Sequence, residues 1–183
     1  GGTSGDVTLN SDLLAKQAGT NFTNSLLVGT SSTGTLNDAN SNTGVGIGVF
    51  GALTTGDNNV AVGLNALDVN TTGCFNTALG ASTLLVNQTG ICNVAIGASA
   101  LRCNTASNNI AVGVQPLYYN TSGTNNTAIG TKALFCNTTA NNNTALGYNS
   151  LLNNTTGASN VAVGNQALDA NTTGGNNIAI GDN

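Results

Sequence analysis

The sequence predicts an all-β fold, a parallel β-solenoid (β-roll) of about nine coils with 17 residues each. One observation is a glycine that recurs with gaps of 17, 17, 17, 16, 17, 17, 17 and 17 residues. Another is the pentapeptide that each of these glycines ends, such as Asn126-Thr-Ala-Ile-Gly130. An Ala-Leu pair and a turn such as Asn171-Thr-Thr-Gly174 then follow. The recurring glycines are Gly46, Gly63, Gly80, Gly97, Gly113, Gly130, Gly147, Gly164 and Gly181.

The pentapeptide predicts a strand, because Val, Ile, Leu or Thr alternates with Ala along it. Ala and Gly form one face of this strand and allow another backbone to approach closely. That neighbour is either the opposite wall of a thin solenoid or a second subunit. One large apolar residue per coil should form a buried ladder, each burial stabilising by roughly 1.5–3 kcal/mol. These residues are Phe50, Leu67, Leu84, Leu101, Leu117, Leu134, Leu151 and Leu168.

Two parts of the chain are expected. Residues 1–24 do not fit the repeat and are interpreted as a cap or as a strand that docks onto another subunit. Residues 25–183 are the solenoid, degenerate at first and regular from residue 42. The short coil before Gly113 loses its residue near Ala106 and Ser107, inside a turn, so the strand register should persist.

The composition excludes several functional classes. Only 5% of the residues are charged, the net charge is −4, and there are three basic residues, so nucleic acid is not an expected partner. No segment has the roughly 20 apolar residues of a membrane span, which predicts no membrane insertion. His and Glu are absent, so no general base is evident and we expect no enzyme. Without His or a Cys-x-x-Cys motif, no metal or other cofactor is expected.

An asparagine opens each pentapeptide. Asn tolerates left-handed backbone at a corner, and stacked amides can bond from coil to coil, so a structural role is expected. The members are Asn59, Asn76, Asn93, Asn109, Asn126, Asn143, Asn160 and Asn177.

A second set of asparagines lies in Asn-x-Thr/Ser, the acceptor motif for N-glycosylation. Two interpretations stay open: an inward or turn-forming Asn, and a glycosylated Asn. Asn104 keeps the turn position but loses the motif at Ala106, which favours turn geometry. Thr pairs in the same turns suggest ice binding only weakly, because adjacent residues point opposite ways. The candidate glycosylation sites are Asn21, Asn70, Asn87, Asn120, Asn125, Asn137, Asn142, Asn153, Asn154 and Asn171.

The four cysteines differ in their positions along the coil. Cys74 and Cys92 fall in neighbouring coils, about 6 Å apart, and form a candidate disulfide. Cys103 and Cys136 share one position two coils apart, roughly 9.6 Å, beyond the reach of a disulfide within one chain. These two are expected to bond between subunits or to stay free.

The ends of the sequence suggest export and assembly. The chain starts at Gly1 and contains no Met, which suggests a removed export signal and an extracellular, cell-surface or virion-surface location. It stops in mid-coil after Ile180-Gly181, and an uncovered strand edge templates pairing with another chain. We therefore expect the open end to dock the next subunit.

The coil Asn-Thr-Ala-Ile-Gly-x-x-Ala-Leu-x-x-Asn-Thr-Thr at residues 126–139 resembles repeats of viral and phage tail-fibre-like proteins. More distantly it resembles the head repeats of trimeric autotransporter adhesins. The resemblance covers about residues 42–183 and implies a parallel β-roll, often trimeric, with the Ala/Gly face near the subunit interface. It also implies extracellular stalks, fibres and adhesive surfaces.

Two functional hypotheses follow. The leading one is a structural subunit of an extracellular filament, assembling end to end with copies of itself. The alternative is a fibre or adhesin shaft that presents a surface for host molecules or cell-surface glycans.

Overall fold

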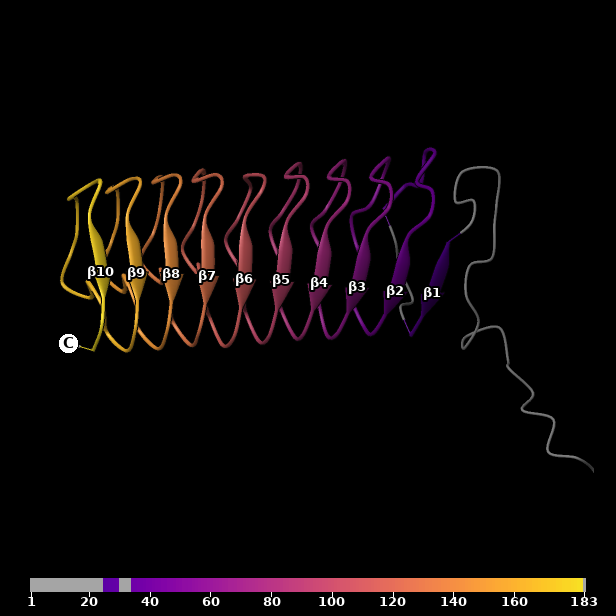
Figure 1. The fold of residues 1–183 in the computed structure, drawn as a ribbon. Helices are drawn as coiled ribbons and strands as arrows, with labels where there is room; N and C mark the ends of the chain where they lie inside the picture. The colour runs from indigo at the N-terminus through magenta and orange to yellow at the C-terminus, as the bar shows by residue number, and fades with distance from the viewer. Residues whose placement is uncertain (1–24, 30–33, 183) are drawn as a thin grey trace, which may run out of the picture.

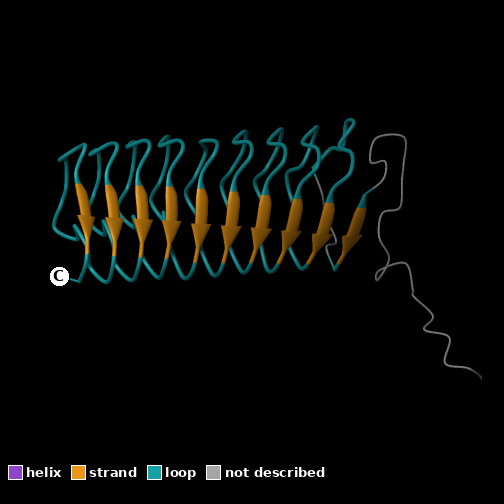
Figure 2. Cartoon of the chain, in the orientation of Figure 1, coloured by secondary structure: helices purple, strands orange, loops and turns teal. Residues whose placement is uncertain are grey.

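The computed structural model describes residues 25–29 and 34–182. These residues form a β-solenoid in which ten short parallel strands lie side by side along one wall (Figure 1). The remainder of each coil consists of turns and loops, and the described residues contain no helix (Figure 2). The expected all-β solenoid is confirmed. Residues 1–24, with their expected cap or docking strand, lie outside the described residues.

The strands follow one another in chain order across the sheet. Each is three residues long and pairs in parallel with the next, usually 17 residues later. The ten strands are β1 (Leu26–Val28), β2 (Thr43–Val45), β3 (Val60–Val62), β4 (Thr77–Leu79), β5 (Val94–Ile96), β6 (Ile110–Val112), β7 (Thr127–Ile129), β8 (Thr144–Leu146), β9 (Val161–Val163) and β10 (Ile178–Ile180).

The 16-residue coil keeps its place in the sheet. Val94 of β5 pairs with Ile110 of β6, so the strand register is intact. The shortening falls in the turn, where Asn104 bonds to the carbonyl of Ala106, two residues later. In the regular turns the equivalent acceptor lies three residues later, as in Asn70 and Gly73. The expected position of the deletion is confirmed.

The Ala face of the sheet points into the coil. The central residue of β2 to β9 is Ala or Gly and is buried within a single chain, so the close neighbour is the opposite wall of the solenoid. A Cβ on Gly44 would meet Val49 Cγ1 at 2.8 Å, which shows how thin this interior is. The implied position of the Ala/Gly face at a subunit interface is therefore wrong.

The buried ladder is confirmed at Phe50 and at six leucines, whereas Leu168 is only partly buried. The backbone of the buried leucines was not expected. Leu67, Leu84, Leu101, Leu117, Leu134 and Leu151 are fully buried, yet their φ angles lie between 48° and 52°. Left-handed backbone is rare for bulky residues. Two interactions hold it here: burial of the side chain and a hydrogen bond from the Leu N–H to the next coil, as from Leu134 to the Ser150 carbonyl at 3.0 Å.

The glycine that sets the period is required by the neighbouring coil. Gly113 has a φ of 133°, and a Cβ there would lie 2.8 Å from the backbone carbon of Gly130. The same contact recurs from coil to coil, so these glycines stack directly on one another. No side chain fits between them, which explains the strict recurrence of glycine.

Candidate functional site

The interior of the solenoid holds two columns of asparagine side chains. The first, named here the strand-side ladder, comprises Asn42, Asn59, Asn76, Asn93, Asn109, Asn126, Asn143, Asn160 and Asn177. Each Oδ1 accepts the backbone N–H of the ladder member in the next coil, at 2.9–3.0 Å. The expected bonding from coil to coil is confirmed. The expected left-handed φ is wrong for these residues, because the preceding residue, such as Asn58 or Phe75, takes it.

The second column, named here the turn-side ladder, comprises Asn70, Asn87, Asn104, Asn120, Asn137, Asn154 and Asn171. Each Nδ2 bonds to the Oδ1 of the preceding member, as from Asn137 to Asn120 at 2.8 Å. Each Nδ2 also donates to a carbonyl in its own turn. Of the two interpretations of these asparagines, the inward one matches the structure.

The two ladders converge on one carbonyl in each coil. The Gly73 oxygen accepts Asn59 Nδ2 at 2.8 Å and Asn70 Nδ2 at 3.0 Å. The same pair of bonds occurs at Gly90, Ala106, Gly123, Ala140, Gly157 and Gly174. Buried amides are costly unless they are bonded, and here both lone pairs of the carbonyl are used. The ladders thus lock the turn to the strand.

Five of the candidate glycosylation sites are corrected by this geometry. Asn70, Asn87, Asn120, Asn137 and Asn154 are fully buried, and their Nδ2 atoms donate within the coil. A glycan attached to Nδ2 has no room at these positions. Of the others, Asn125, Asn142 and Asn153 are exposed and Asn171 is half-buried, while Asn21 lies outside the described residues.

The threonine column beside the turn-side ladder is used within the fold. Thr71, Thr121 and Thr155 donate their hydroxyls to carbonyls of the next coil at 3.0 Å. These hydroxyls bond along the solenoid axis, so they reinforce the stacking.

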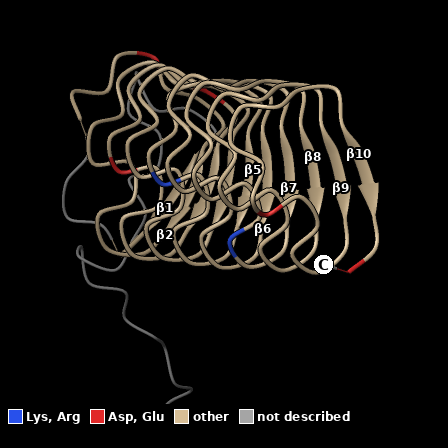
Figure 3. Ribbon diagram, turned by 90° about the vertical axis from the view of Figure 1, so that its left-hand side faces the viewer, with Lys and Arg blue, Asp and Glu red and all other residues tan. Residues whose placement is uncertain are grey.

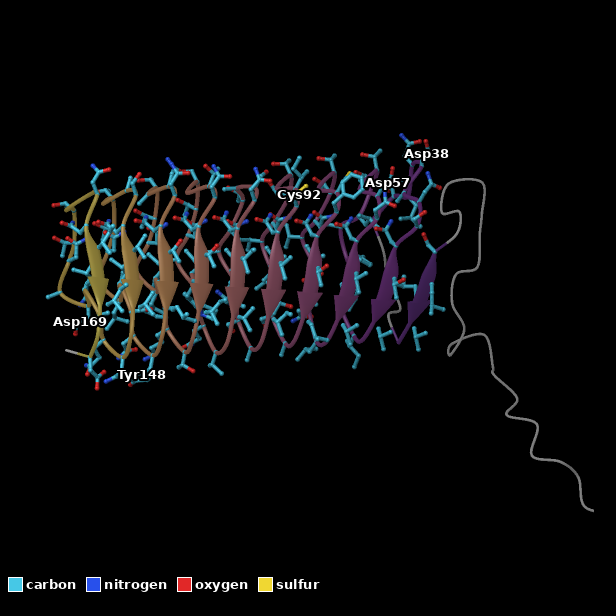
Figure 4. All side chains as sticks on the ribbon, viewed as in Figure 1. Asp38, Asp57, Cys92, Tyr148 and Asp169 are labelled. Atoms are coloured by element: carbon cyan, nitrogen blue, oxygen red, sulfur yellow. The ribbon has the colours of Figure 1, made fainter. Side chains whose placement is uncertain are left out.

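The candidate disulfide between Cys74 and Cys92 is not formed. The backbones are neighbours, since the Cys92 N–H donates to the Cys74 carbonyl at 3.1 Å. The Cys74 Sγ, however, accepts the N–H of Asp57 in the preceding coil and so is directed away from the coil of Cys92. All four cysteines are free thiols. Cys92 is exposed at a turn (Figure 4).

Cys103 and Cys136 lie beside an aromatic cluster that was not predicted from the sequence. Tyr118, Tyr119 and Phe135 lie with ring centroids 4.7–5.4 Å apart. Arg102 lies over the Tyr118 ring at 5.6 Å and Lys132 over the Phe135 ring at 5.5 Å. Burial raises the pKa of the Cys136 thiol. In the sequence, the signal for this cluster is the presence of aromatic residues at equivalent positions of neighbouring coils.

The outer face of the sheet carries only uncharged side chains. The first and third residues of the strands point outward, and they are Val, Ile, Leu or Thr without exception. None of these outward residues is buried. The charged residues of the described part lie in the turns and loops (Figure 3). We call these outward residues the strand face.

No family model, curated protein or solved structure matches this chain. The resemblance to tail-fibre and autotransporter repeats therefore stays a prediction. In the described part of the chain no three His, Cys, Asp or Glu side chains gather as a metal site would require. Nor does that part contain a helix long and apolar enough to cross a membrane.

Proposed function

We propose that this protein is a structural subunit of an extracellular filament, in which rods are extended by stacking coil on coil. The supporting observation is the uniformity of the junctions between coils. From one coil to the next the same strand pairing, the same bond from a backbone N–H to an Asn Oδ1 and the same glycine contacts recur. A coil of another copy would meet the same donors and acceptors, so a junction between copies can equal a junction within one.

The amide ladders suit this role because they bond along the rod axis. In a buried chain of hydrogen bonds, each bond polarises its neighbours and so strengthens them. Stacked Asn side chains are typical of very stable β assemblies. A rod built in this way resists bending at its turns, since each turn carbonyl is held by two amides. The proposal includes no catalytic activity and no cofactor.

Electron cryo-microscopy of the purified chain tests this proposal. Filaments longer than one chain, with an unbroken axial repeat of about 4.8 Å across the subunit junctions, would support it. Rods that keep the length of one chain at high protein concentration would contradict it.

A second candidate function is a fibre or adhesin shaft, and the aromatic cluster favours it. The cluster and its two cations draw on three coils, and Arg102 and Lys132 are the two basic residues of the described part. Tyr119 is 48% exposed and could stack on a sugar ring. A glycan array would test this: binding that is lost in Tyr119→Ala would support the shaft, and absence of binding would leave only the filament.

A further inference from the structure

We propose that the strand face is an interface with a second copy of this chain, seated face to face. This lateral contact differs from the stacking of coils along the rod, and it does not depend on the proposed filament. Aliphatic side chains on this face are exposed to solvent. Ile129 of β7 is 38% exposed, Leu146 of β8 is 44% exposed and Val60 of β3 is 42% exposed, although all are aliphatic.

The strand face is large enough for a stable interface. It presents two outward side chains on each of ten strands. At roughly 50 Å² per partly exposed side chain this is on the order of 1,000 Å², comparable to the ~800 Å² that each partner buries in a standard interface. Sixteen of the twenty outward side chains are Val, Ile or Leu and four are Thr. Exposed, mainly apolar patches larger than a few hundred Å² mark interaction sites in soluble proteins.

The strand face also lacks the features that keep sheets apart. The surfaces of soluble proteins usually intersperse charged side chains of both signs. No residue of β1 to β10 is charged or is Pro. Lys132 and Arg102 lie outside the strands and pack on aromatic rings instead. Two such faces therefore meet without electrostatic repulsion and without burying an unpaired charge.

The periodicity of the face identifies the occupant. Its side chains repeat with the strand spacing of about 4.8 Å, over the whole sheet. For the side chains of a partner to fit between those of this face along all ten strands, the partner must have the same period. A second copy of this chain has that period. Paired sheets about 10 Å apart with interdigitated aliphatic side chains are a known dry packing.

The test is the mass of the full chain by sedimentation velocity and light scattering, at tens of micromolar. We expect a dimer for the unmodified chain. The double variant Ile96→Lys, Ile129→Lys places two charges on the strand face and should halve the mass. These side chains point outward, so the interior is unchanged and the β-sheet circular dichroism should persist. The control Thr72→Lys, Thr156→Lys adds the same charge at exposed turn positions and should remain dimeric.

Three results would overturn the proposal. They are a monomeric unmodified chain, an Ile96→Lys, Ile129→Lys variant that keeps the dimer mass, and a trimer, because two flat faces that cover each other leave none for a third copy. If the chain forms filaments, mass per unit length replaces total mass. Filament length then reports coil stacking and mass per length reports the face contact, so each idea can fail alone.

Discussion

The Oδ1 atom of Asn109 accepts two hydrogen bonds from Asn126, from its backbone N–H at 3.0 Å and from its Nδ2 at 3.2 Å. One side chain thus satisfies the backbone and the side chain of the next coil together. The backbone bond recurs at each step of the strand-side ladder, and the Nδ2 bond recurs at every step except those to Asn109 and Asn143. Buried amides therefore contribute to the stability of the rod beside the aliphatic packing.

Replacing one ladder member should destabilise the fold strongly. In Asn126→Ala the Asn143 N–H loses its acceptor inside the coil, and the Ala140 carbonyl loses one of two donors. Each unsatisfied buried group costs about 1–3 kcal/mol, so the free energy of unfolding should fall by about 2–4 kcal/mol. Urea unfolding followed by circular dichroism measures it. The exposed control Asn165→Ala should stay within about 0.5 kcal/mol. Equal effects of both substitutions would contradict a bonded ladder.

The left-handed backbone of the aliphatic ladder predicts an unusual ranking of conservative substitutions. Leu134 has a φ of 52° and is fully buried. Leu134→Met keeps the volume and an unbranched Cβ, and should cost less than about 1.5 kcal/mol. Leu134→Ile keeps the volume but branches at Cβ, which is disfavoured at positive φ, and should cost about 2–3 kcal/mol. Thermal unfolding of both variants compares them. A smaller loss for Ile than for Met would refute the role of the backbone.

Glycan attachment should follow exposure. When the chain is produced through a glycosylating secretory pathway, we expect no glycan on Asn87, Asn120 or Asn137 in the folded fraction, because their Nδ2 atoms are buried and bonded. Any glycans on the described residues should occupy Asn125, Asn142 or Asn153, which are exposed. Glycopeptide mass spectrometry reads each site. Substantial glycan occupancy at Asn120 in folded, protease-resistant protein would contradict this expectation.

The thiols should differ in reactivity. Cys92 is exposed, whereas burial raises the pKa of Cys136 and so lowers its thiolate fraction at pH 8. The thiolate is the reactive form, so iodoacetamide should modify Cys92 several-fold faster than Cys136. The labelling rate of Cys136 should also rise with pH, and this rise should occur at a higher pH than for an ordinary thiol. Peptide mass spectrometry at timed intervals measures both rates, and unfolding in urea should make them equal. Faster labelling of Cys136 in the folded chain would be inconsistent with its burial.

The period, the strands and the buried ladder that includes Leu67 were predictable from the sequence. Each coil of a solenoid contacts mainly its neighbours, so the repeated local pattern determines most of the fold. Even the lost residue near Ala106 could be placed in its turn, since a deletion within a strand would have reversed the two faces. The amide stacking from Asn59 onward was expected for the same reason.

Only the tertiary structure decided which way the remaining groups point. Asn70 reads as a glycosylation site or as an interior amide from its motif alone, and its burial selects the second. The Cys74 thiol turns toward Asp57, a contact 17 residues away that no spacing argument contains. The sign of φ at Leu134 and the exposure of Ile129 likewise depend on how the coil closes. Sequence periodicity determines which residues stack, and closure of the coil determines which of them face solvent.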